Sequence, residues 1–201
     1  MQILPIEQID FSSLVASLRT GQTLVYPTET CYGLGCMATD AEAVKKIFLI
    51  KQRAEDKPCL LLFSNKEMVQ EYVEWNDELE RLSNRYWPGA LTILMTPKIG
   101  KIFPPGVVGK NGQIAGRVSD HPFAQGLTSH LGVPLVSTSA NIAGLPSPYS
   151  IEAVTSMFQN QIHQPDLIID AGILPENLPS TIVEVVGEEI RVVRQGNVVV
   201  E

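Results

Sequence analysis

Three clusters of short polar side chains stand where apolar segments of the sequence end. They are Thr28–Tyr32, Ser137–Asn141 and the pair Ser180–Thr181. Hydroxyl and amide groups orient a small polar ligand without adding charge, which suits an amino acid, a ribose or a phosphate. The same residue types also cap helices and fill turns, so each cluster alone is only weak evidence for a site.

Four cations accompany these clusters. Lys51 and Arg53 stand at the end of a predicted helix, whereas Arg117 and Arg194 lie in predicted strands. In an acidic chain, cations beside hydroxyl-rich turns indicate a polyanionic ligand. For Lys51 and Arg53 the commoner alternative is a favourable interaction with a helix C-terminus. An arginine inside an apolar strand needs a carboxylate or phosphate partner, because an unpaired buried charge is costly.

Catalytic motifs of other enzyme classes are missing from the sequence. His121, His130 and His163 are scattered, and we interpret His121, which precedes a proline, as structural. No Ser-His-Asp order, HExxH or GxxxxGK[ST] is present, which gives hydrolase and P-loop interpretations no support. Many positioning groups without an evident nucleophile favour phosphoryl or nucleotidyl transfer, usually with Mg²⁺.

Composition limits the class of protein. The chain has 201 residues with 44% hydrophobic content, enough for one core, and we expect a single domain over residues 1–201. A net charge of -7 argues against a broad basic face for nucleic acid. The three cysteines lack paired CxxC spacing and predict reduced thiols in a cytoplasm. No apolar run approaches the ~18 residues of a membrane span.

Hydrophobic periodicity and capping signals predict the elements that would position these residues. Helices are expected over 11–19, from a Thr39 cap to Lys51, from a Ser64 cap, after Asn76 or Asp77, over 122–131 and from a Ser150 cap. Strands are expected over 23–26, 59–63, 90–96, 114–118, 134–136, 167–170, 181–186 and 190–194. The last two strands form a predicted hairpin around Gly187–Glu189. The fold class is therefore α+β (α/β-like), with a twisted mixed sheet flanked by helices.

Two irregular segments leave alternatives open. Residues 27–35 predict a turn between a strand and a helix, which either binds a ligand beside its glycines or is only a tight turn. Residues 97–113 form a long segment rich in Pro, Gly and Lys, without an apolar period. That segment is either a surface excursion or a lid over the site.

Ordered motifs spread over about Gln22 to Gly196 resemble those of the TsaC/YrdC family of threonylcarbamoyl-AMP synthases, in the short bacterial form. The motifs are Pro27-Thr28-Glu29-Thr30 with Tyr32-Gly33-Leu34, Lys51-Gln52-Arg53 with Lys57-Pro58, Trp87-Pro88-Gly89-Ala90-Leu91-Thr92, Arg117-Val118 with Asp120-His121-Pro122, Ser137-Thr138-Ser139-Ala140-Asn141 with Gly144, Ser180-Thr181-Ile182-Val183, and Arg194-Gln195-Gly196. Several motifs in one order are far more specific than any single motif.

The resemblance implies an activity and its partners. The enzyme would condense L-threonine, bicarbonate and ATP, taken with Mg²⁺, into L-threonylcarbamoyladenylate and pyrophosphate. A separate threonylcarbamoyl transferase complex would then pass the threonylcarbamoyl group to the adenosine beside the anticodon of tRNA. The resemblance also implies a cytoplasmic protein that does not act at a membrane.

The resemblance further implies residue roles. Thr28 and Arg117 would hold threonine, Arg117 through the carboxylate, with Tyr32 lining the pocket. The nucleotide would be held by Lys51, Arg53, Ser139, Asn141 and Arg194, with Lys51 and Arg53 as the catalytic cations. Ser137 and Ser180 would lie between the two ligands, and no metal-ligating protein residue is implied.

The sequence departs from the family pattern at two positions and leaves two other functions open. Ala54 and Ser119 stand where many relatives have proline, which puts local geometry in doubt more than function. The first alternative is an RNA-binding or ribosome-associated module with a local basic groove, built on Lys51, Arg53, Lys57 and Arg117. The second is a paralogue with a different amine substrate.

Overall fold

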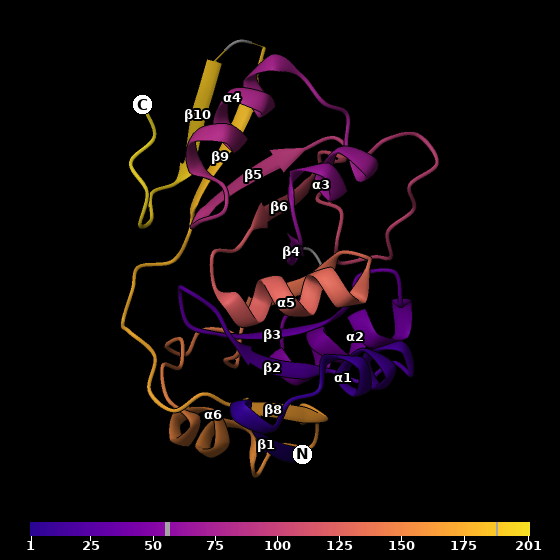
Figure 1. The fold of residues 1–201 in the computed structure, drawn as a ribbon, viewed down its shortest axis with the longest axis vertical. Coiled ribbons are helices and arrows are strands. Elements are labelled where there is room, and N and C mark those ends of the chain that lie inside the picture. Colours follow the sequence, from indigo (N-terminus) through magenta and orange to yellow (C-terminus); the bar gives the residue numbers. More distant parts are fainter. Residues whose placement is uncertain (55–56, 188) are drawn as a thin grey trace.

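The computed structural model of the chain describes residues 1–54, 57–187 and 189–201. Ten described strands form one sheet in the order β1-β8-β2-β3-β7-β4-β6-β5-β9-β10, which spans the long axis of the molecule (Figure 1). The strands are β1 (Gln2–Pro5), β2 (Leu24–Pro27), β3 (Tyr32–Met37), β4 (Leu60–Phe63), β5 (Leu91–Met95), β6 (Ile114–Val118), β7 (Leu135–Ser139), β8 (Leu167–Asp170), β9 (Thr181–Val186) and β10 (Glu189–Arg194). Parallel pairs such as β4–β6 and antiparallel pairs such as β3–β7 confirm the predicted mixed sheet.

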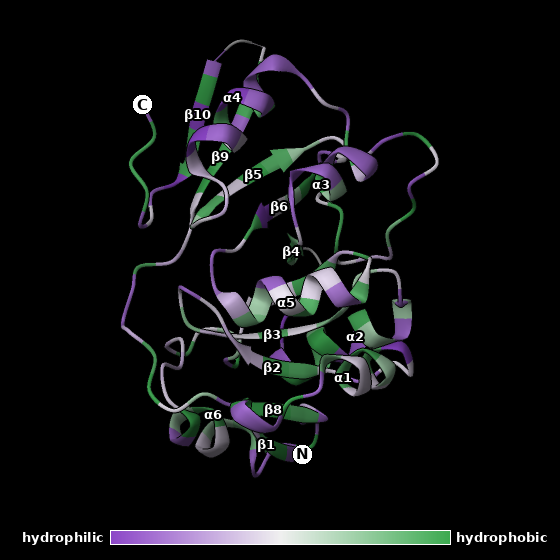
Figure 2. Ribbon diagram, in the orientation of Figure 1, coloured by the Kyte–Doolittle hydropathy of each residue, from purple (hydrophilic) through white to green (hydrophobic). Residues whose placement is uncertain are grey.

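Helices cover both faces of this sheet. They are α1 (Phe11–Arg19), α2 (Ala41–Lys51), α3 (Lys66–Tyr72), α4 (Asp77–Tyr86), α5 (Pro122–Leu131) and α6 (Ile151–Phe158), with a short 3-10 helix at Ile6–Gln8. Side chains alternate along a strand, so Leu24 and Tyr26 of β2 pack with α1 and α5, while Val25 joins the core under α2. Apolar strands such as β2 and β8 contrast with the polar outer surfaces of the helices (Figure 2). No helix in the described part of the chain is long and apolar enough to cross a membrane.

Helix starts were predicted closely, with two shifts of one residue. Asn76 and Ser150 cap α4 and α6 as expected, accepting from Leu79 N and Ala153 N. The predicted caps Thr39 and Ser64 were wrong. The adjacent Asp40 and Asn65 cap α2 and α3 instead, and their side chains accept from the amides three residues on, at 3.0 and 2.8 Å.

The predicted strand-to-helix turn over residues 27–35 was wrong. Its second half is strand β3, which pairs antiparallel with β2 and with β7. Gly35 looked like a loop residue, yet a Cβ there would lie 2.1 Å from the Val136 carbonyl oxygen. The glycine therefore permits close strand pairing, which tertiary packing alone reveals.

Two further differences concern the middle of the sheet and one of its edges, while the strands at its other edge agree with prediction. Ser137 and Ser139 belong to strand β7 itself rather than to the turn after it. Strand β1 was not predicted; it pairs parallel with β8 at the sheet edge. The β9–β10 hairpin is confirmed by its antiparallel register, while Glu188 of its predicted turn lies outside the described residues.

Candidate active site

A cavity of about 370 Å³ opens over the middle of the sheet. Its lining combines all three polar clusters with three arginines. The lining residues are Thr28, Thr30, Cys31, Gly33, Arg53, Pro58, Cys59, Leu60, Ala115, Arg117, Ser137, Thr138, Ser139, Ser147, Tyr149, Pro179, Ser180, Ile182 and Arg194. Seven of the ten predicted site residues therefore line one cavity; Tyr32, Lys51 and Asn141 do not.

Strand register explains why the cavity forms there. Leu60 of β4 pairs with Ser137 of β7, and Leu62 pairs with Arg117 of β6, so these side chains share one face. Helix α5 packs on the same face against Leu62. The face beside the helix is lined by short side chains and by Gly33, where a Cβ would crowd Ser137 Oγ at 3.4 Å. The missing side chain leaves room for a ligand.

Arg117 lies at the floor of the cavity and is only 3% exposed. Its Nη1 forms an ion pair with Glu29 Oε1, and the Ser119 hydroxyl donates to Glu29 Oε2. The contact with Glu29 is an ion pair only: among the described residues neither Nη1 nor the buried Nε of Arg117 has a hydrogen-bond partner. Burial lowers the pKa of Arg117 to about 10, which leaves the guanidinium cationic at neutral pH. This cation has one carboxylate partner and a free donor.

Arg53 and Arg194 line the cavity with neutral partners. Arg53 Nη2 donates to the Pro58 carbonyl at 3.1 Å, and its buried Nε has no hydrogen-bond partner in the described chain. Arg194 Nη2 donates to the Ser180 carbonyl at 2.6 Å and to the Ser180 hydroxyl at 3.2 Å. Burial lowers the pKa of Arg194. Among the described residues, which do not include Glu55 and Asp56, no carboxylate forms an ion pair with either arginine, and we call the two arginines uncompensated in this sense.

Lys51 and Asn141 stand behind the cavity wall. Lys51 is 2% exposed, and its Nζ donates to the Ser139 carbonyl and to both Asn141 oxygens, the latter at 2.9 Å. The Ser139 hydroxyl also donates to Asn141 Oδ1 at 2.6 Å. Burial lowers the pKa of Lys51 to about 8. In this structure the lysine ties the last residue of β7, Ser139, to Asn141 just after the strand, and it does not line the cavity.

Thr28 and Tyr32 are both buried but differ in where their hydroxyls go. Thr28 Oγ1 donates to the Cys31 carbonyl at 2.7 Å and accepts from Thr30 N, which closes the β2–β3 turn at the cavity edge. Tyr32 Oη donates to the Gly172 carbonyl at 2.9 Å and accepts from Ala171 N. Tyr32 therefore supports the segment that leads to Ser180.

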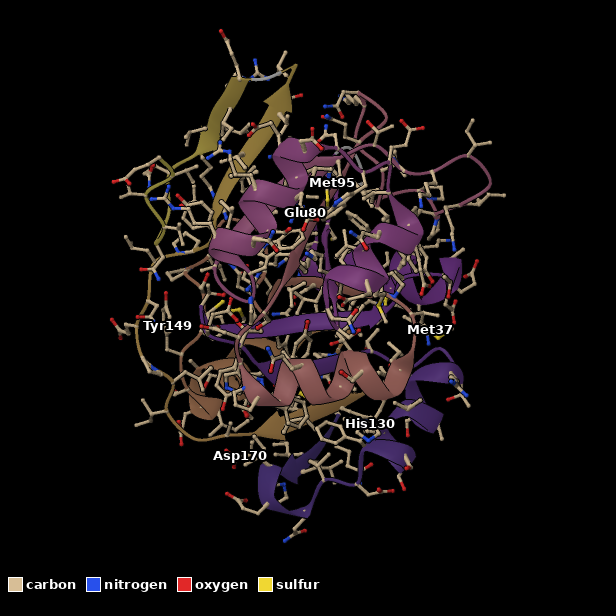
Figure 3. The ribbon with its side chains drawn as sticks, turned by 45° about the horizontal axis from the view of Figure 1, so that its top comes forward. Met37, Glu80, Met95, His130, Tyr149 and Asp170 are labelled. Atoms are coloured by element: carbon tan, nitrogen blue, oxygen red, sulfur yellow. The ribbon has the colours of Figure 1, made fainter. Side chains whose placement is uncertain are left out.

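Sequence reasoning missed several residues at the site. Glu29 belongs to the motif Pro27-Thr28-Glu29-Thr30, but no binding or catalytic role was predicted for it. Tyr149 lies in an irregular segment without hydrophobic periodicity. Tyr149 stands beside one end of β3 (Figure 3), and its hydroxyl donates to the Asn177 carbonyl at 3.1 Å. Ser147 and Tyr149 line the cavity together with Pro179 and Ser180. None of the residues 97–113 lines it, although the Gly106 carbonyl accepts from the amide of Cys59, one of the lining residues, at 2.8 Å.

The cavity offers positioning groups rather than a nucleophile. Burial raises the pKa of the Cys31 and Cys59 thiols, which are free and stay protonated at neutral pH. In residues 1–54, 57–187 and 189–201, no group of three His, Cys, Asp or Glu could hold a metal ion. The arrangement can bind an anionic ligand and hold it against a neighbouring group.

Comparison with known proteins places the chain in a family. The sequence profile of the Sua5/YciO/YrdC family, described as "Telomere recombination", matches residues 16–196. The chain belongs to the Sua5/YciO/YrdC family. It is 38% identical over 167 residues to a protein named threonylcarbamoyl-AMP synthase from Pseudoalteromonas atlantica, covering 81% of this chain and 85% of the relative.

Two solved Sua5/YciO/YrdC structures are also similar. P. abyssi Sua5, solved in complex with L-threonine, matches with a TM-score of 0.87 and 31% identity over 98% of this chain. The chain spans only 58% of that protein. E. coli YciO matches with a TM-score of 0.83 and 26% identity, over 97% of this chain and 94% of YciO. The predicted family and fold are confirmed.

Proposed function

We propose that this chain is an L-threonylcarbamoyladenylate synthase, which condenses L-threonine, bicarbonate and ATP into threonylcarbamoyl-AMP and pyrophosphate. Relatives that match most of the chain carry the name threonylcarbamoyl-AMP synthase. The observation that carries the proposal is one cavity holding three arginines with different partners. A carboxylate-paired arginine and two uncompensated arginines suit an amino acid and a polyphosphate, bound side by side.

Threonine binds at Arg117. The buried, unpartnered Nε donates to the substrate carboxylate, and Thr28 and Ser137 border the same end of the cavity. The Ser137 hydroxyl accepts from the buried Tyr26 hydroxyl at 2.7 Å, so its orientation is fixed before the ligand arrives. P. abyssi Sua5, which was solved with L-threonine, supports this choice of amino acid.

ATP binds toward Arg53 and Arg194. Their uncompensated charges meet the phosphates, and Ser139 and Ser180 supply hydroxyls. Lys51 and Asn141 do not line the cavity; they hold Ser139, the last residue of β7, in place through their hydrogen bonds. Lys51 is therefore a positioning residue in this structure rather than a phosphate contact.

The reaction joins these two ligands. The threonine amine captures bicarbonate as a carbamate with loss of water, and a carbamate oxygen then attacks the α-phosphorus of ATP. The new P–O bond forms as the bond from the α-phosphorus to the bridging oxygen breaks, and pyrophosphate leaves. Holding both reactants in one cavity makes this step nearly unimolecular. Arg53 stabilises the charge that builds up on the leaving group.

Mg²⁺ fits this site only as a partner of the nucleotide. Among the described residues the cavity lining includes no carboxylate, and its polar groups are hydroxyls, thiols and guanidiniums. Mg²⁺ prefers oxygen ligands and in nucleotide sites is held largely by phosphates and water. When bound, the ion would neutralise phosphate charge, while the protein side chains position the nucleotide.

A second enzyme must use the product. Threonylcarbamoyl-AMP is a reactive mixed anhydride, and we expect a transferase complex acting on tRNA to receive it in the cytoplasm. Direct contact of this chain with tRNA is not needed for the synthesis.

Pyrophosphate release tests the proposal. Purified protein is supplied with ATP, Mg²⁺ and bicarbonate, with L-threonine, with L-serine, and with no amino acid. Release that depends on threonine and bicarbonate is the expected result. Binding of ATP without threonine-dependent release would favour a paralogue with another amine substrate. RNA binding with a steep salt dependence and no ATP consumption would favour the RNA-binding alternative.

A further inference from the structure

Glu29 and Ser119 are joined by a hydrogen bond beside Arg117, and neither of them lines the cavity. The Glu29 side chain is 14% exposed. One of its carboxylate oxygens pairs with Arg117 Nη1, and the other accepts from the Ser119 hydroxyl. Ser119 is 2% exposed and also accepts from His121 N at 3.2 Å. The serine is thus fixed on both sides and holds the carboxylate against the guanidinium.

This pairing changes the charge that a ligand meets. Arg117 with Glu29 is neutral overall, yet Arg117 Nε remains buried and without a hydrogen-bond partner in the described residues. A ligand oxygen at Nε satisfies a costly buried donor. A simple carboxylate would, however, leave the buried cluster with a net negative charge. A ligand that carries an ammonium beside its carboxylate restores neutrality.

We propose that Glu29 makes the Arg117 subsite selective for a zwitterionic amino acid over a simple carboxylate, with Ser119 as the residue that positions Glu29. The inference rests on the proposed function, because it takes Arg117 as the carboxylate-binding residue. Ser119 enters the inference because its buried hydroxyl donates to the Glu29 carboxylate. Neither residue touches the substrate; both act through Arg117.

Direct calorimetric binding separates charge selectivity from a structural role. The two ligands are L-threonine and 2,3-dihydroxybutanoate, in which a hydroxyl replaces the ammonium. The measured quantity is the ratio of their affinities in wild type, Glu29→Gln, Glu29→Asp and Ser119→Ala. Glu176→Gln is the matched control, because it removes the same charge from an exposed position on the segment that precedes Ser180.

The preference for threonine is expected to fall about tenfold or more in Glu29→Gln, because the subsite becomes cationic and accepts an anion more readily. Ser119→Ala should lower the preference for threonine by about threefold, since this substitution keeps the Glu29 charge and removes one hydrogen bond. Glu29→Asp retains the charge and should keep a ratio near that of wild type, even if both affinities fall. The Glu176→Gln ratio should stay unchanged.

Two results would overturn the inference. Equal weakening of both ligands in Glu29→Gln would make Glu29 a purely structural residue. An unchanged ratio in Ser119→Ala, with threonine affinity also unchanged, would remove Ser119 from the role, and this variant serves if Glu29→Gln does not fold. Wild-type pyrophosphate release is measured in parallel, so a failed selectivity test with an active enzyme overturns only this inference.

Discussion

The two arginine environments of the cavity differ in how their charge is balanced. Arg117 is fully buried against the Glu29 carboxylate, whereas Arg53 and Arg194 donate to carbonyl and hydroxyl oxygens. We call these the Arg117 side and the Arg53–Arg194 side. Both sides use the same guanidinium group, and in the described chain the buried Nε of Arg117 and that of Arg53 each have no hydrogen-bond partner.

This difference in charge balance explains how one cavity can bind an amino acid on one side and a polyphosphate on the other. A compensated arginine offers direction and hydrogen bonds with little net charge, which suits a zwitterion. Uncompensated arginines offer net positive charge, which suits a polyphosphate. The chain has a net charge of -7, so this local field, rather than the whole molecule, must attract the nucleotide.

Removing charge from the Arg53–Arg194 side should have the largest effect. Arg53→Ala is expected to lower threonine-dependent pyrophosphate release about a hundredfold, about 3 kcal/mol of barrier, since the leaving group loses its stabilising cation. Initial rates at saturating threonine measure it. The control is Arg81→Ala, an exposed arginine paired with Glu78, and this variant should keep the wild-type rate. Wild-type turnover in Arg53→Ala would refute the role of this side.

Adding a carboxylate to the same side would erase the difference between the two environments. The Thr138 hydroxyl lies 3.4 Å from Arg53 Nη1, so Thr138→Asp places a carboxylate there. ATP affinity is expected to fall about tenfold, because the arginine becomes compensated, while threonine affinity changes less. Thr138→Val removes the hydroxyl without adding charge and should lose much less. Equal losses in the two variants would contradict the charge argument.

The smallest expected effect is on ATP affinity and concerns Lys51, the cation that does not line the cavity. Lys51 has a pKa near 8, so it is protonated below about pH 8 and neutral above it. A neutral amine has two N–H donors for the three acceptors of Ser139 and Asn141, so ATP affinity should fall about threefold between pH 7 and pH 9. Calorimetry at both pH values measures the change. Lys51→Met should bind ATP more weakly and without this pH dependence. An equal loss of ATP affinity between pH 7 and pH 9 in Lys51→Met would show that another group titrates.

Element types followed closely from local pattern. The α1 helix, the β6 and β8 strands and the β9–β10 hairpin agree with prediction, because their apolar periods and flanking residues are strong. Strands β1 and β3 were missed for opposite reasons. Strand β1 is an exposed edge without a clear alternation, and β3 contains glycines that a local interpretation assigns to a turn.

The sequence by itself determined the mixed sheet, the family and the residue types that gather in the cavity. Polar clusters beside apolar runs, and single arginines within apolar runs, can be recognised in the sequence. Residue type indicates whether a position is buried and whether a buried charge needs a partner. Only the tertiary structure decided which side each group faces. Lys51 and Tyr32 turn away from the cavity to hold neighbouring segments, and Glu29 reaches Arg117 across 88 positions of sequence. Such pairings depend on strand register and side-chain direction, which no local pattern records.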